Sequence, residues 1–137
     1  MPIAPVANGI YYITRGNPEN PPLLFIAGLG GGTSSWMMLL PTYNLANPNP
    51  LYLIAYDPRG LDKSGETAGY GLQEMVDDAR ALLAYLNIPR AHILGWSLGG
   101  IVAQTFAYTY PETVDKLVLL ATAPMSPTAP ELQEFNQ

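Results

Sequence analysis

The sequence contains no cysteine, one histidine and few charged side chains among its 137 residues. The absence of cysteine excludes a disulfide framework, a thiolate nucleophile and a cysteine-based metal site. Charged residues make up 12% of the chain, and the six basic ones are scattered, with a net charge of -5. A chain without a basic cluster cannot neutralise many phosphates, so we expect no nucleic-acid partner.

Long apolar runs and targeting features are also missing. The first residues have neither the basic nor the long apolar stretch of a signal peptide. The longest apolar runs, such as residues 117–121, are far shorter than the ~20 residues of a membrane-spanning helix. These absences favour a cytoplasmic protein without membrane contact. The glycine-rich residues 28–32 match no phosphate-binding pattern, and no motif predicts a cofactor or a metal.

The composition is otherwise that of a globular protein, because apolar residues make up 48% of the chain. The length fits a single domain over residues 1–137. Residues 122–137 are proline-rich and weakly patterned, and we expect them to begin a lid or a flexible tail. So few charges are unusual for a small domain, which has proportionally more surface. We therefore expect part of this surface to be apolar or to be covered by something else.

Apolar runs bounded by glycine, proline and asparagine alternate with segments of helical periodicity. Alternation with short links predicts an α/β fold, with about five mostly parallel strands and helices on both faces of the sheet. The expected strands are 10–14, 23–27, 51–56, 91–95 and 114–121, and the expected helices are 34–45, 72–86 and 98–110.

One motif carries chemistry: residues 95–100 read G-W-S-L-G-G, which is G-x-S-x-G between an apolar strand and an apolar helix. This context is typical of a nucleophile elbow, in which a strained turn presents the serine, here Ser97. Gly95 and Gly99 would supply the clearance that the turn needs. The alternative is an ordinary serine that caps a helix. The elbow predicts a positive φ at Ser97 and a side chain that lines a cleft.

The motif and two further segments together resemble the α/β-hydrolase fold family over essentially the whole chain. The segments are 21–32 (PPLLFIAGLGGG), 53–64 (LIAYDPRGLDKS) and the motif with its flanks. The nearest group resembled is that of enol-lactonases, carbon–carbon-bond hydrolases and esterases. The resemblance implies a small ester or lactone as substrate, and the backbone amides of Leu29 and Leu98 as the oxyanion hole.

Two positions depart from the family pattern. Ala27 stands where many relatives carry a histidine, and Asp62 replaces a glycine of D-x-R-G-x-G-x-S. Asp57, Arg59 and Ser64 match that pattern. The resemblance implies a structural role for them, as a turn tied by an Asp–Arg pair at the rim of the sheet.

The larger departure from the family pattern concerns the catalytic acid and base. The family order is serine, then Asp or Glu, then histidine, but no histidine follows Ser97 in this sequence. His92 lies five residues earlier on the same strand, about 16 Å away, beyond the reach of a general base. We therefore expect a hydrolase scaffold with weak activity at most. Two alternatives stay open: an inactive structural fragment, or half of a split hydrolase that another chain completes.

Other candidate side chains are ambiguous. Asp77 and Asp78 could be paired carboxylates, but beside Arg80 on a helix they more simply form a solvated face. Trp96 could line an acyl pocket or pack against the sheet.

In complete relatives the strand at 114–121 lies inside the sheet. Here we expect its outer edge to be apolar and unpaired, which predicts a homo-oligomer, most simply a dimer, through this strand.

Overall fold

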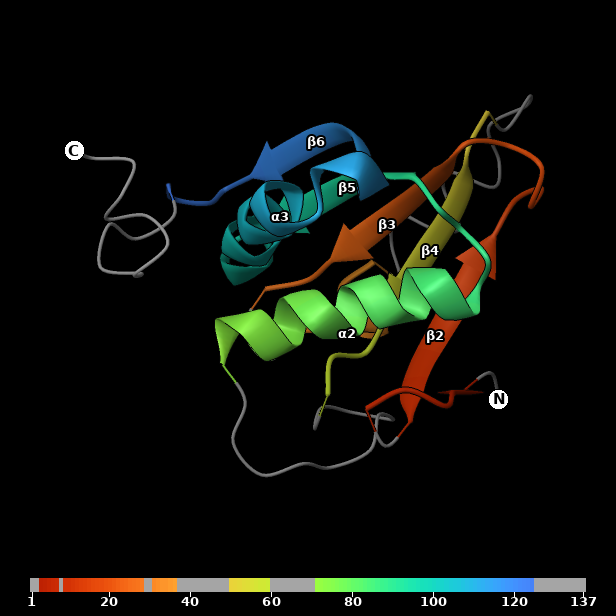
Figure 1. The fold of residues 1–137 in the computed structure, drawn as a ribbon, viewed down its shortest axis with the longest axis horizontal. Coiled ribbons are helices and arrows are strands. Elements are labelled where there is room, and N and C mark those ends of the chain that lie inside the picture. The colour runs from red at the N-terminus through yellow and green to blue at the C-terminus, as the bar shows by residue number, and fades with distance from the viewer. Residues whose placement is uncertain (1–2, 8, 29–30, 37–49, 60–70, 125–137) are drawn as a thin grey trace.

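One mixed sheet forms the centre of the computed structural model, which describes residues 3–7, 9–28, 31–36, 50–59 and 71–124 (Figure 1). Its strand order is β1-β2-β4-β3-β5-β6. The strands are β1 (Ile3–Ala4), β2 (Ile10–Arg15), β3 (Pro22–Ile26), β4 (Tyr52–Tyr56), β5 (Ala91–Trp96) and β6 (Val114–Leu120). Four neighbouring strands, β4, β3, β5 and β6, run parallel, as the alternation of strand and helix predicts.

The N-terminal end of the sheet differs from the expectation of about five strands. A two-residue strand, β1, pairs antiparallel with β2, and β2 pairs antiparallel with β4. The link between β1 and β2 is short and turns at Gly9, whose φ is 106°. A link this short can join only antiparallel neighbours, because a parallel crossover needs a dozen residues or more.

Two α-helices are described, α2 (Leu72–Tyr85) and α3 (Leu98–Thr109), and they contact each other on the same side of the sheet (Figure 1). A short 3₁₀ helix, η1 (Thr33–Trp36), stands where the helix over residues 34–45 was expected to begin. The rest of that helix, and the tail from residue 125 onward, lie outside the described residues. Within the described part of the chain, no helix is long and apolar enough to cross a membrane.

The core has two parts, one on each face of the sheet. Alternate residues of β3 and β4 point to opposite faces, so Leu24 and Ile54 pack with α2 and α3, whereas Phe25 and Leu53 pack with Trp36 of η1. The two faces are therefore covered by different segments, and β3 and β4 are buried between them. This burial explains why both strands are apolar without alternation.

Arg59, just after β4, is tied to α2. Its guanidinium donates to both carboxylate oxygens of Asp78, at 2.8 and 2.5 Å. The prediction of a solvated face is wrong for Asp78, which is 5% exposed. The periodicity of a helix cannot reveal a partner that comes from another segment. Asp77, in contrast, is exposed as expected, and it accepts hydrogen bonds from Gln73 and from the Tyr110 hydroxyl.

Candidate active site

Ser97 occupies the turn between β5 and α3, at the carboxyl end of the parallel strands. Its φ of 57° and ψ of -122° lie outside the regions that L-residues ordinarily occupy. The predicted positive φ is thus confirmed. Such a backbone conformation stores on the order of 1–3 kcal/mol and persists only where the surroundings hold it. The residue is exposed, so the turn presents its side chain at the surface.

The glycines of the motif are required by close backbone contacts. A Cβ on Gly95 would overlap the carbonyl oxygen of Gly99, and a Cβ on Gly99 would overlap that of Ile26 in β3. Any side chain at these two positions would push α3 away from the sheet or distort the turn. The clearance that the sequence predicted at Gly95 and Gly99 is therefore confirmed.

The end of β6 and the residues that follow it hold the elbow from the other side. The Ser97 amide donates to the carbonyl oxygen of Leu120 at 3.0 Å. The Thr122 hydroxyl donates to the carbonyl oxygen of Ser97 at 2.6 Å. The Thr122 side chain also lies against Gly100, where a Cβ would overlap it. The end of β6 is thus part of the structure that fixes the conformation of Ser97.

The predicted oxyanion donors are the amides of Leu98 and Leu29, of which the structure describes only the first. Leu98 is the first residue of α3, and amides in the first turn of a helix have no intrahelical acceptor. Leu29 lies outside the described residues, but its neighbour Gly28 does not. A Cβ on Gly28 would lie 3.2 Å from the Ser97 Cβ and 3.3 Å from the carbonyl oxygen of Trp96. The loop after β3 therefore begins in contact with the elbow.

Asp57 holds the far end of the same loop, a contact that sequence reasoning missed. It directly follows β4 and is fully buried. Its Oδ1 accepts hydrogen bonds from the Thr33 amide at 2.7 Å and the Thr33 hydroxyl at 2.9 Å. The ion pair of Arg59 described above joins Asp78, so the turn after β4 is tied to two other segments. In the sequence, Asp57 is marked by the family pattern and by its place immediately after a buried strand, but neither signal identifies Thr33 as its partner.

Aromatic side chains flank the elbow. Trp96, 42% exposed, meets Trp36 edge to face with ring centroids 6.4 Å apart, and Trp36 packs on Phe25 at 4.7 Å. Trp96 thus packs on an aromatic neighbour and still exposes part of its side chain next to Ser97. The structure is therefore compatible both with a packing role and with a role in lining an acyl pocket. The indole N–H of Trp36 is buried, and the described part of the chain offers it no acceptor.

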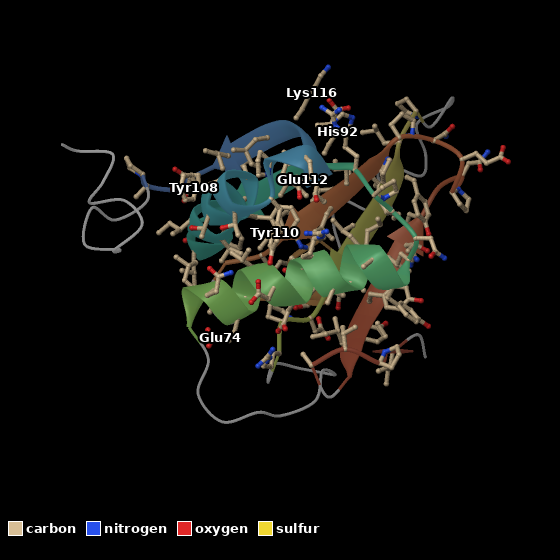
Figure 2. All side chains as sticks on the ribbon, in the orientation of Figure 1. Glu74, His92, Tyr108, Tyr110, Glu112 and Lys116 are labelled. Carbon is tan, nitrogen blue, oxygen red and sulfur yellow. The ribbon has the colours of Figure 1, made fainter. Side chains whose placement is uncertain are left out.

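His92 lies at the other end of β5 from Ser97. It pairs with Leu23 at the start of β3, and its Nδ1 is 3.7 Å from Asp115 Oδ2 at the start of β6 (Figure 2). The extended strand separates it from Ser97 by roughly 16 Å, so it cannot take a proton from the serine hydroxyl. No group of three or more His, Asp or Glu side chains among the described residues could hold a metal ion.

The family model for the alpha/beta hydrolase fold matches residues 21–137, and the chain belongs to this family. It is 32% identical over 113 residues to 3-oxoadipate enol-lactonase 2 of Acinetobacter baylyi, covering 82% of this chain and 41% of that protein. It is 30% identical over 109 residues to the putative carbamate hydrolase RutD of Agrobacterium fabrum, covering 77% of this chain and 40% of that protein.

Solved structures agree with this assignment. A hydrolase from Pseudomonas aeruginosa superposes with a TM-score of 0.82 at 31% sequence identity, covering 98% of this chain and 50% of that one. The chain therefore spans half or less of the length of these relatives, and the matched part carries the elbow.

Proposed function

We propose that this chain provides the nucleophile of a serine hydrolase that acts on small esters or lactones. The observation that carries the proposal is the backbone of Ser97, with φ at 57° in a strand–turn–helix elbow that a loop contacts at Gly28. Strained backbone of this kind clusters at catalytic sites. The substrate class rests on the relatives, which include an enol-lactonase and a putative carbamate hydrolase.

In the proposed reaction, the Ser97 Oγ attacks the carbonyl carbon, and the electron pair of the C=O bond moves to the oxygen. The amides of Leu29 and Leu98 stabilise that oxyanion, an effect typically worth 10²–10³ in rate for each donor. The intermediate collapses to an acyl-enzyme as the alcohol leaves with a proton, and water then releases the acid. Both halves of the reaction need a group that accepts and returns a proton.

The one histidine of the sequence is His92, which is too far from Ser97 to be that group, and in the family the acid and the base follow the nucleophile in the sequence. We propose that the acid and the base come from polypeptide beyond these 137 residues, as in a hydrolase completed by another segment or chain. Alone, this chain would then hydrolyse activated esters weakly, far below the ~10 s⁻¹ of a typical enzyme. An inactive structural role is the alternative.

We further propose that the chain self-associates, most simply as a dimer, through the outer edge of residues 114–121. Among the described residues, β6 is the last strand of the sheet, and its apolar residues Leu117 to Leu120 are 38–44% exposed. Consecutive residues point to opposite faces, so β6 is apolar and open on both. That composition is typical of a strand inside a parallel sheet, and an open apolar edge invites pairing. A completing polypeptide would cover the same edge.

A fluorophosphonate probe tests the nucleophile. We expect the whole chain to be labelled on Ser97, and the labelling to be lost in Ser97→Ala. Absence of labelling in the native chain would support the inactive alternative. Labelling that persists in Ser97→Ala would place the reactive group elsewhere.

Sedimentation at micromolar concentration tests the assembly, and a 14.8 kDa monomer would contradict self-association.

A further inference from the structure

The buried carboxylate of Asp57 has contacts that a purely structural turn does not require. Asp57 directly follows β4 and is 0% exposed. One oxygen, Oδ1, accepts from both the amide and the hydroxyl of Thr33, which lies 24 residues earlier in the chain. Hydrogen bonds to a charged acceptor are roughly twice as strong as neutral ones. Asp57 is thus a strong anchor for the start of η1.

The anchored segment is the end of the loop that reaches Ser97. Gly32 lies so close to Asp57 that a Cβ on it would overlap Oδ1. The Gly31 amide donates to the carbonyl oxygen of Gly28 at 2.9 Å, which ties the two described ends of this loop together. Gly28 in turn contacts Ser97. The loop is therefore held at one end by Asp57 and meets the elbow at the other.

We propose that Asp57 is a positioning residue for the site at Ser97, acting through Thr33. It fixes the path of the loop between β3 and η1, so that the backbone entering the site at Gly28 keeps its place against the elbow. This inference rests on the proposed function. The physical reason is that backbone donors act in catalysis only when they are held in place beforehand, and a displacement of about 1 Å can cost 10² in rate.

Two substitutions weaken the anchor by different amounts. Asp57→Asn keeps the shape and removes the charge from the acceptor. Thr33→Val keeps the amide hydrogen bond and removes the hydroxyl donor, which makes it the milder variant should Asp57→Asn fold poorly. Thr33→Ser keeps both donors and serves as the conservative rescue. The matched control is Asp78→Asn, a buried carboxylate that is held by Arg59 on α2 rather than by the loop.

The first measurement is the second-order rate constant of fluorophosphonate labelling on the whole chain, corrected for the folded fraction. We expect Asp57→Asn to slow labelling by roughly 10- to 100-fold and Thr33→Val to slow it less. We expect Thr33→Ser and Asp78→Asn to stay within about twofold of the native chain. An Asp57→Asn variant that is folded and labels at the native rate would overturn the proposal, as would an equal loss in Asp78→Asn.

The second measurement is hydrogen exchange of the amides in residues 31–36. Exchange there should accelerate in Asp57→Asn and stay unchanged in Asp78→Asn, because only the first variant releases the loop. Unchanged exchange in Asp57→Asn would overturn the anchor itself. If the native chain is not labelled on Ser97, the proposed function fails and the positioning role fails with it, whereas exchange still decides whether Asp57 holds the loop.

Discussion

The strain at Ser97 can be measured by replacing the serine with two small residues. Ser97→Ala removes the hydroxyl and keeps the Cβ that makes the backbone conformation unfavourable, whereas Ser97→Gly removes both. Relief of strain should raise the free energy of unfolding of the glycine variant by about 1–3 kcal/mol relative to the alanine variant. The extra conformational freedom of glycine in the unfolded chain should lower it by about 0.5–1 kcal/mol. We therefore expect Ser97→Gly to be the more stable of the two, by about 1 kcal/mol.

Urea unfolding of both variants gives this difference directly, provided that their slopes against denaturant agree. For a chain of this length, 1 kcal/mol corresponds to roughly 4 °C in Tm, between the values for smaller and larger domains. The matched control is Ala81→Gly inside α2, which should cost about 0.8–1 kcal/mol because its backbone is helical. If Ser97→Gly is less stable than Ser97→Ala by that same amount, the elbow stores no strain and the argument from its backbone fails.

Gly99→Ala should destabilise the chain by about 1–3 kcal/mol in urea unfolding and abolish labelling of Ser97, because its Cβ would overlap the carbonyl oxygen of Ile26; a stable, labelled variant would refute the close contact. Arg59→Met should cost about 2–3 kcal/mol, less than the 3–5 kcal/mol of a fully buried pair, since Arg59 is 19% exposed while Asp78 is left buried; a Tm unchanged within 2 °C would contradict this. Val118→Lys on the open edge of β6 should shift sedimentation from dimer to monomer, because a lysine on an edge strand opposes pairing; an unchanged dimer would place the interface elsewhere.

The sequence predicts the sheet well where its signals are local. β3 and β4 are continuous apolar runs, β5 and β6 are mostly apolar, and the glycines at 95 and 99 predict the strained turn that the structure has. β1 is missed because two residues between prolines carry no periodicity. The Arg59–Asp78 pair and the Asp57–Thr33 contact are missed for another reason. Each joins segments 19 or 24 residues apart, and only the tertiary fold brings such partners together.

The same separation explains what is predicted of the site and what is not. Ser97 is found from a short motif because the elbow is built from neighbours in sequence. The groups that would position or activate it are not neighbours. The loop after β3 and the hydroxyl after β6 contact the elbow directly, and the carboxylate after β4 contacts that loop. They lie together because parallel strands end at the same side of the sheet.

This arrangement links the open edge of the sheet to the proposed chemistry. The Ser97 amide is hydrogen-bonded to the last residue of β6, and Thr122 holds the Ser97 carbonyl oxygen. Any polypeptide that pairs with the outer edge of β6 would therefore stiffen the strand that fixes the elbow. A strand that pairs with β6 in parallel would also have its carboxyl end on the same side of the sheet as Ser97. It would lie two strand spacings from β5, or about 10 Å. Side chains on the loop after such a strand would lie close enough to be the proton acceptor that the proposed reaction needs. Pairing with a second copy of this chain would bring only the stiffening, because its one histidine is again His92, so a protein concentration that populates the dimer should raise the rate of labelling on Ser97 by a more ordered elbow and not by a new base; a labelling rate that does not change with assembly would contradict this link.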